Sequence, residues 1–284
     1  MQSIIQTTEI GSTMKILTFD LEDWVIYHRH NLGTEKQLED ILNNILELLN
    51  NRNITATFFC LGSLARKYPH IVTQVTSNGH QIGCHSDQHR WITDMTPKSF
   101  SEDTHQAIDS IEQIIGKKVI TYRAPAFSIT STNPWAFDIL YENGIIYDSS
   151  VFPASRDFGG FPSYKEQKPS TIYHNGVILK EFPIPIIHIC GKAIAYSGGG
   201  YFRMIPYPLL KHWFAQNEYI MTYFHIRDFD NHQKRYWTKR YFKNYYGVNG
   251  AFPKFKQIIK SFDYQDIETA GAQVNWKDVP MIQI

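Results

Sequence analysis

The feature that most constrains the fold is an alternation of short apolar strands with amphipathic helices. MKILTFD at 14–20 is an apolar run that ends in an acid, and ITATFFC at 54–60 is rich in β-branched and aromatic residues. Between them, residues 34–51 place leucine and isoleucine at helical spacing behind Thr34, the expected N-cap. This order predicts a mainly parallel α/β sheet, either doubly wound or closed into a barrel.

The same alternation continues along the chain. We expect a single domain over 14–284, preceded by an N-terminal extension at 1–13 and interrupted by a Pro- and Gly-rich insertion at about 152–208. A helix and a short edge strand should end the chain. Further helices are predicted near 63–77, 97–115, 133–143 and 207–216, and further strands within 80–86, 119–125, 144–150 and 218–230.

Composition excludes several classes of function. Twenty-eight Lys and Arg balance twenty-seven Asp and Glu, so no global charge indicates nucleic acid or an anionic membrane as partner. No apolar stretch approaches a membrane span, and the first residues lack a signal-peptide pattern. Three widely spaced cysteines argue against a disulfide framework. These features lead us to expect a cytoplasmic protein; the oligomeric state stays open.

Aromatic residues make up 14% of the chain and gather between Tyr196 and Tyr246. Such rings either stack on sugars at a surface or pack a core, and the sequence favours neither. Within this region, Gly198 to Gly200, Tyr201 and Arg203 are candidates for a roof over a substrate. Arg203 could pair with an anionic sugar or phosphate, or lie exposed on a mobile loop.

Ionisable residues follow one predicted strand after another. The carboxyl ends of parallel strands meet at one edge of a sheet or barrel, where active sites form. We therefore expect a single site there. Its candidate residues are Asp20, Glu22, Asp23, His85, His89, Arg123, Asp148 and His225.

His85 and His89 are four residues apart, and on a helical turn both rings would share one face. Clustered carboxylates at Asp20, Glu22 and Asp23 repel one another unless a cation relieves them. One of these acids could complete a site for a zinc-like ion that keeps a position open for water, and another could act as a general base. The alternatives are histidines on a surface loop and a solvated helix start.

His225 ends a largely apolar strand and is either a proton donor to a leaving group or a satisfied core histidine. Asp148 could orient such a histidine. Cys84 should point away from His85 along a strand, which favours a buried packing role.

The segments TFDLED, HSDQH, RAPAF, YDSS and YFH occur in the order and at the approximate spacing of the motifs of the polysaccharide deacetylase family of the NodB homology type. The chain resembles this family over about 14–230. SGGGYFRMIP and the YYGVNG tail resemble a subgroup associated with exopolysaccharide and capsule synthesis. The resemblance implies a distorted (β/α) barrel, often seven-stranded, and metal-dependent hydrolysis of N-acetyl groups from an amino sugar in a polysaccharide or lipid-linked glycan.

The resemblance also implies roles for individual residues. Asp20 would be the catalytic base, held by Arg123, and His225 the catalytic acid, tuned by Asp148. His85 and His89 would bind the divalent metal, expected to be zinc, and the Ala126 N–H would be an oxyanion donor.

The third metal ligand is ambiguous, because the family's two adjacent aspartates are replaced by Asp20, Leu21, Glu22 and Asp23. Strand alternation favours Glu22, whereas a turn after Leu21 would favour Asp23, whose shorter side chain is the family's usual ligand and which we prefer slightly. Two other functions fit the same residues: hydrolysis of a formyl group or a cyclic imide or ureide, and catalytically silent glycan binding. The intact acid and base set argues against the silent protein.

Overall fold

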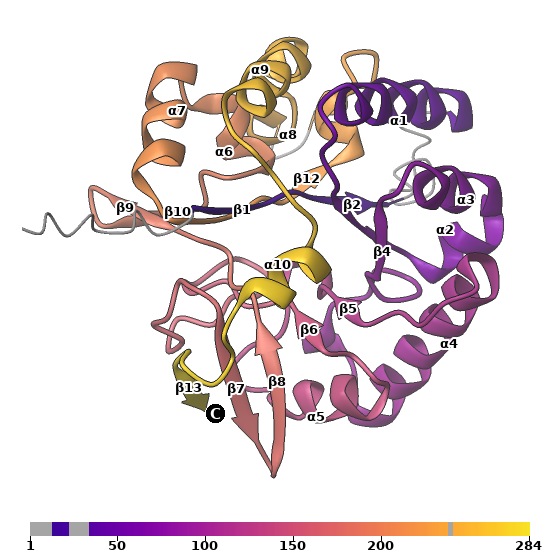
Figure 1. Cartoon of the computed structure of the whole chain (residues 1–284), viewed down its shortest axis with the longest axis vertical. Helices are drawn as coiled ribbons and strands as arrows, with labels where there is room; N and C mark the ends of the chain where they lie inside the picture. The colour runs from indigo at the N-terminus through magenta and orange to yellow at the C-terminus, as the bar shows by residue number, and fades with distance from the viewer. Residues whose placement is uncertain (1–12, 23–33, 238–240) are drawn as a thin grey trace, which may run out of the picture.

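The computed structural model describes residues 13–22, 34–237 and 241–284. A single sheet of nine strands runs in the order β12-β2-β3-β4-β5-β6-β8-β7-β13 and dominates the fold (Figure 1). The strands are β2 (Thr18–Leu21), β3 (Thr57–Cys60), β4 (Gln81–Cys84), β5 (Thr121–Tyr122), β6 (Tyr147–Asp148), β7 (Ser170–His174), β8 (Val177–Glu181), β12 (Phe224–His225) and β13 (Met281–Gln283).

The seven strands from β12 to β8 are joined by parallel pairings throughout, while β7 runs antiparallel to β8. The predicted mainly parallel α/β architecture is confirmed. Among the described residues no strand pairing joins β12 to β8, so backbone hydrogen bonds do not close the barrel. A side-chain hydrogen bond links the two edges instead. The hydroxyl of Tyr219, in the segment before β12, donates to the carbonyl of Pro183, which follows β8 (2.8 Å).

Two small sheets flank the main one. β1 (Met14–Ile16) pairs in parallel with β11 (Tyr219–Met221), and β9 (Ile187–Ile189) forms a hairpin with β10 (Lys192–Ile194). The strand expected over 218–230 is therefore divided into β11 and β12. Thr222 lies at the division, where its hydroxyl accepts from the backbone N–H of Thr18 (2.8 Å) and locks the two chain segments together.

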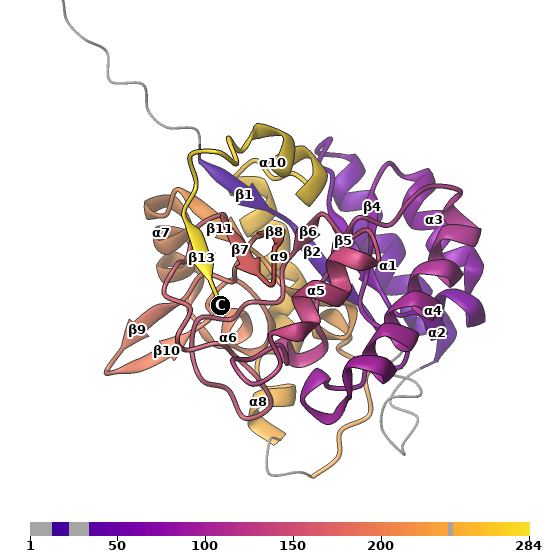
Figure 2. The same ribbon diagram turned by 90° about the horizontal axis from the view of Figure 1, so that it is seen from below.

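Helices α1 (Glu35–Asn50), α2 (Gly62–Lys67), α3 (Pro69–Ser77) and α4 (Pro97–Ile115) lie along one side of the sheet, as Figures 1 and 2 show. Thr34 caps α1 as predicted and Thr96 caps α4, each accepting a bond from the third helical N–H. The single helix expected near 63–77 is two helices, because Tyr68 leaves helical geometry before Pro69.

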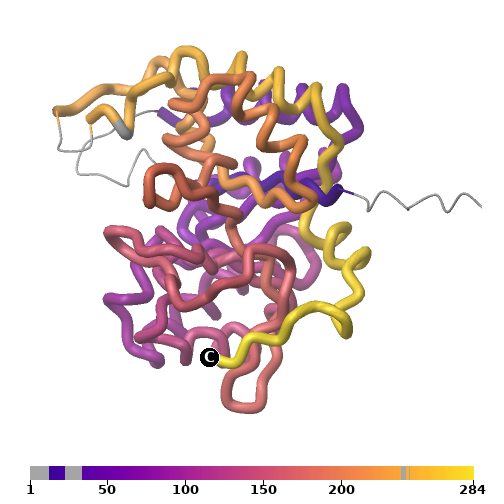
Figure 3. The backbone as a smooth tube through the Cα atoms, turned by 90° about the vertical axis from the view of Figure 1, so that its left-hand side faces the viewer, coloured from indigo at the N-terminus to yellow at the C-terminus, as the bar shows by residue number. Residues whose placement is uncertain are grey.

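The remaining helices are α5 (Trp135–Glu142), α6 (Gly199–Met204), α7 (Tyr207–Gln216), α8 (Tyr241–Tyr245), α9 (Val248–Ser261) and α10 (Ile267–Gln273), with short 3-10 turns η1 (Ile92–Asp94), η2 (Pro125–Phe127) and η3 (Ile226–Phe229). The C-terminal segment descends one side of the molecule to place β13 beside β7 (Figure 3). Within the segment expected as an insertion, β7 and β8 join the main sheet. None of the described helices is long and apolar enough to cross a bilayer.

Alternation along the strands separates two packed faces. Phe58 and Cys84 belong to the core between sheet and helices, as predicted for Cys84, whereas Phe59 packs in a second cluster on the opposite face. Gly83 lies on that opposite face, where an added Cβ would approach Thr121 Oγ1 to 2.5 Å. The aromatic region divides too: Tyr196 and Phe214 are core residues, while Trp237, Phe242 and Tyr246 are exposed.

Candidate active site

Asp20 lies at the end of β2 and is held by an arginine from the end of β5, which is separated from β2 by β3 and β4 in the sheet. Arg123 follows β5, has no exposed surface, and its Nη1 donates to Asp20 Oδ1 (2.9 Å) and to Thr18 Oγ1 (2.7 Å). Its Nη2 donates to Ser149 Oγ (3.0 Å), and its guanidinium lies 4.3 Å from the centre of the Phe59 ring. The buried charge is thus paired and the Asp20 carboxylate is fixed in one orientation.

Glu22 lies between the two histidines. Its Oε1 is 2.8 Å from His89 Nε2 and 3.3 Å from His85 Nε2, and all three side chains are buried. Burial raises the pKa of the Glu22 carboxyl, but the charges of His89 and His225 outweigh it and hold the pKa well below its usual range. Asp23, the other candidate ligand, lies outside the described residues.

The hydrogen bonds of His85 fix its tautomer. His85 Nδ1 lies 2.7 Å from the carbonyl oxygen of Arg123, which can only accept, so Nδ1 carries a proton. In the neutral ring Nε2 therefore presents a lone pair toward a carboxylate oxygen. Two facing acceptors repel each other unless a proton or a metal ion lies between them, so the donor set fits a cation.

The helical turn expected for His85 and His89 is wrong. Residues 85–90 form an irregular loop in which Ser86 and His89 have positive φ values of 68° and 54°. One local and one tertiary contact support this shape: His89 N donates to Ser86 Oγ within the loop (2.9 Å), and Asp87 Oδ1 and Oδ2 accept from Arg66 on α2 (2.6 and 2.9 Å). The rings meet at 5.2 Å between centroids through the loop rather than through helical periodicity.

His225 ends β12 with its Nε2 3.7 Å from Asp20 Oδ2 and 3.8 Å from Glu22 Oε1. Its Nδ1 lies 3.3 Å from Asp228 Oδ2, which also accepts from the His225 backbone N–H (2.9 Å). Burial lowers the pKa of His225, but the charge of Glu22, the bond and charge of Asp228, and the charge of Asp20 outweigh it and raise the pKa to about 9.

The carboxylate next to Nδ1 of His225 is thus Asp228 rather than Asp148. Asp148 is buried; its Oδ1 accepts from Ser150 Oγ (2.5 Å), and its Oδ2 and Oε2 of the buried Glu181 have no hydrogen-bond partner within the described part of the chain. Burial raises the pKa of Asp148 to about 6 and that of Glu181 well above its usual range. The spacing in HIRD, three residues after the histidine, is the signal that could have identified Asp228.

Arg203 lines the cavity, so its contact with an anionic substrate stays a prediction, whereas the alternative of an exposed arginine on a mobile loop is wrong. Arg203 is buried and forms an ion pair with Asp228, and it donates to the carbonyls of Tyr246 (3.2 Å) and Asn244 (3.1 Å). Burial raises the pKa of Asp228, but Arg203 and then His225 outweigh it and hold the pKa well below its usual range. Arg203 therefore already has partners within the protein where it lines the cavity.

The glycines before Arg203 also serve a packing role. An added Cβ on Gly198 would lie 2.1 Å from the carbonyl oxygen of Tyr223, so Gly198 lets α6 approach the chain beside β12. Gly199, Gly200 and Tyr201 do line the cavity, as the roof prediction requires.

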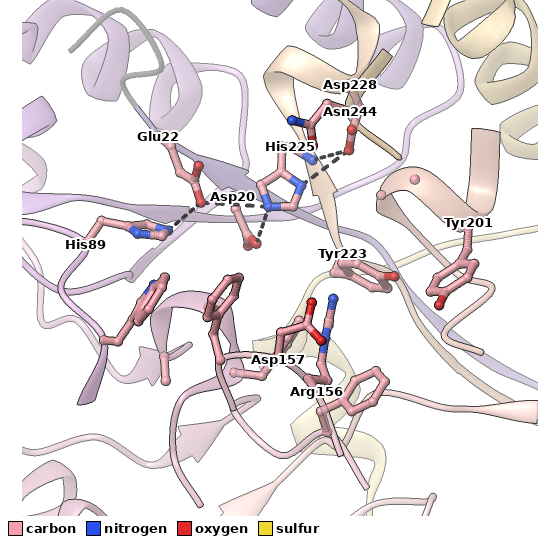
Figure 4. Close-up of a pocket in the computed structure, with 18 of the residues that line it drawn as sticks. Asp20, Glu22, His89, Arg156, Asp157, Tyr201, Tyr223, His225, Asp228 and Asn244 are labelled. Atoms are coloured by element: carbon pink, nitrogen blue, oxygen red, sulfur yellow. Dashed lines mark hydrogen bonds and ion pairs between the residues drawn. The ribbon is translucent and has the colours of Figure 1, made fainter. Parts of the chain in front are cut away.

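One cavity of about 420 Å³ joins these groups (Figure 4). Asp20, Glu22 and His89 face His225 across it, and Tyr201 and Tyr223 lie farther along. Ala126 also lines it, in a left-handed conformation with φ 53°. No hydrogen bond engages the Ala126 N–H within the described residues, which leaves it able to donate to a ligand.

Two family models match consecutive parts of the chain. Residues 11–137 match the polysaccharide deacetylase model, and residues 149–272 match a domain of unknown function, DUF3473. The first segment contains Asp20, His85 and His89, and the second contains His225 and Asp228.

Among curated proteins, a peptidoglycan-N-acetylglucosamine deacetylase of Bacillus cereus is 47% identical over 108 residues, which is 38% of each chain. In this and other curated relatives the aligned segment spans less than half of the relative's length.

Among solved structures, a putative polysaccharide deacetylase of Mycobacterium smegmatis matches with a TM-score of 0.63 at 16% identity, covering 96% of this chain and 94% of that one. A CE4 family pseudoenzyme of Bacillus anthracis matches with a TM-score of 0.53 at 11% identity, covering 96% and 68%. These two likenesses show the shared α/β fold.

Proposed function

We propose that this chain, which carries a domain of the polysaccharide deacetylase family, is a metal-dependent hydrolase that removes N-acetyl groups from an amino sugar in a polysaccharide or lipid-linked glycan. One observation carries the proposal: a single cavity brings an arginine-held carboxylate and a carboxylate-held histidine next to a Glu-His-His donor set. The names of the deacetylase relatives support the choice of an acetylated sugar over other amides.

Glu22, His85 and His89 would hold the divalent cation. Their donor atoms lie within 4.8 Å of one another, and two imidazoles with one carboxylate suit zinc. Asp20, Glu22 and His225 form a second such group, but Asp20 Oδ1 is already committed to Arg123. We therefore assign the cation to Glu22 and the two histidines, with Asp23 as the remaining candidate.

The bound cation would supply Lewis acidity to the acetyl carbonyl and would acidify a water molecule. Asp20, oriented by Arg123, would accept the proton of the attacking water molecule as its oxygen bonds to the carbonyl carbon. The Ala126 N–H donates to the oxygen on which negative charge develops. His225, held by Asp228, delivers a proton to the departing sugar nitrogen, which leaves a free amine and acetate.

Acetate release from an N-acetylglucosamine oligomer, with and without a chelator, tests the proposal. Asp20→Asn should lower turnover by roughly 100-fold or more while the metal content is retained, and the exposed Asp109→Asn is a matched control. Loss of metal in Asp20→Asn would make Asp20 a ligand instead. Release of formate or opening of a cyclic ureide would favour the other amide hydrolases.

Binding of glycans without hydrolysis of any of them would favour a catalytically silent glycan-binding protein. The fold likeness to a pseudoenzyme makes this control worthwhile.

We also propose that residues 14–284 work as one domain and that the protein is cytoplasmic. Pairing of β12 with β2 across the two matched segments supports the first point. The three unpaired cysteines support the second. Fractionation of cells that express the full-length protein tests the location.

A further inference from the structure

Arg156 is a charged side chain in the cavity that the proposed chemistry does not use. It projects from the loop that follows β6 and lines the cavity beside Tyr223 (Figure 4). Its Nη1 atom is buried and has no hydrogen-bond partner among the described residues. A guanidinium stays charged at all physiological pH values, so an unpartnered buried N–H needs an explanation.

Two aromatic rings fix the position of this guanidinium. Its Cζ lies 4.6 Å from the ring centre of Phe152 and 5.3 Å from that of Phe127. Such contacts orient the planar group without using its N–H donors. Both phenylalanines are buried, so they offer the arginine a rigid support.

The loop that carries Arg156 is anchored to the same support. Arg156 N donates to Gly159 O (3.0 Å), and Gly160 N donates to Phe127 O (2.8 Å). An added Cβ on Gly159 would lie 2.2 Å from Phe127 O, and Gly160 has a φ of +93°, so both positions require glycine. The arginine is therefore held in place before any ligand arrives.

The other arginines described above are already neutralised. Arg123 is paired with Asp20, and Arg203 is paired with Asp228. Asp157 follows Arg156 and lines the same cavity, so an anion bound there must gain from directed hydrogen bonds rather than from net positive charge. A planar oxyanion such as a carboxylate, or a phosphate, matches the paired N–H groups of a guanidinium.

We propose that Arg156 forms a subsite for an anionic group, a carboxylate or a phosphate, on the glycan whose N-acetyl group reaches Asp20 and His225. The inference rests on the proposed function for the identity of the ligand as a glycan. It assigns the substrate class as acidic amino-sugar glycans, either with a uronate neighbour or with a phosphate on the sugar.

Binding is measured by calorimetry in the full chain with the Asp20→Asn change, which prevents turnover. The probes are neutral chitotetraose, a tetrasaccharide that alternates N-acetylglucosamine with glucuronate, and N-acetylglucosamine 1-phosphate with N-acetylglucosamine as its neutral counterpart. Arg156→Gln should weaken one of the two anionic probes by about tenfold or more. It should change the neutral probes by less than about twofold. Which anionic probe responds distinguishes a carboxylate from a phosphate.

Arg227→Gln is the matched control, because Arg227 is another arginine of the cavity. Equal weakening in both variants would indicate general electrostatics and would overturn the subsite. Equal losses for neutral and anionic probes, or no preference for either anion in the chain with Arg156 intact, would overturn it too. If the protein releases acetate from chitotetraose but shows no Arg156-dependent preference for an anionic probe, the subsite is contradicted and the proposed function is supported. If Arg156-dependent anion binding is found but no glycan releases acetate, the subsite is supported and the proposed function is contradicted.

Discussion

Asp228 Oδ2 lies 2.9 Å from the backbone nitrogen of His225 and 3.3 Å from its Nδ1. A carboxylate that accepts from Nδ1–H directs the Nε2 atom into the cavity and stabilises the protonated ring. Arg203 in turn holds Asp228. In the proposed mechanism, we therefore expect this pair to perform the orienting role that the resemblance assigned to Asp148.

Asp228→Asn should lower kcat/KM by about 10- to 100-fold, because the proton donor loses its orientation and part of its basicity. Since Asp228 raises the pKa of His225 and activity requires the protonated ring, the alkaline limb of the pH–rate profile should move to lower pH. Asp148→Asn is the comparison and should leave that limb in place. A shifted limb in Asp148→Asn alone would restore the role of Asp148.

Glu22→Gln should lose most of the bound metal, measured by elemental analysis after dialysis, because the amide oxygen brings no negative charge to the two imidazoles. Asp23→Asn tests the competing ligand and should retain metal. The opposite pattern would identify Asp23 as the ligand and would place Glu22 beside the site.

The loop that carries His85 and His89 is held by Asp87, which accepts two bonds from Arg66. Asp87→Asn weakens this anchor without changing a candidate ligand, so metal affinity should fall by about 10- to 100-fold. Competition with a fluorescent chelator measures it. The neighbouring exposed Asp94→Asn controls for charge, and equal affinity in all three proteins would show that the loop keeps its shape without the anchor.

Asp148 and Glu181 predict a pH dependence of stability. Burial raises the pKa of Asp148 to about 6 and that of Glu181 well above its usual range, so the folded protein keeps protons that the unfolded chain releases above its ordinary carboxyl pKa values. The stability that these groups contribute is present below about pH 4 and is lost as pH rises through the folded pKa values.

The free energy of unfolding should therefore fall less between pH 4 and pH 8 in Glu181→Gln than in the parent protein. The difference between the two falls should be on the order of 1–3 kcal/mol. Urea unfolding at both pH values measures this, and the exposed Glu142→Gln is the control. A parallel loss in all three proteins would show that the pair is not the origin of the dependence.

Much of the fold follows from local pattern. The span 97–115 and its cap at Thr96 are set by periodicity, a side-chain hydroxyl and Pro97, all close together in the chain. The alternation of side chains along a strand likewise predicts from local sequence alone that Cys84 lies in the core. The predicted elements divide at Tyr68, where Pro69 restricts the residue before it, and at Thr222, where a bond from Thr18 competes with local preference.

The candidate site, too, could be predicted from the sequence only in part. The order of the motifs determined that Asp20, His85, His89, Arg123 and His225 belong together, because parallel strands end at one edge. Only the tertiary structure decided which charges meet: Asp228 rather than Asp148 at Nδ1 of His225, Glu22 between the histidines, and Arg203 against Asp228. Side-chain partners depend on the paths of loops, and contacts between residues far apart in the chain, such as the bonds of Arg66 to Asp87, fix those paths. Such contacts produce no repeating pattern of residues from which they could be predicted.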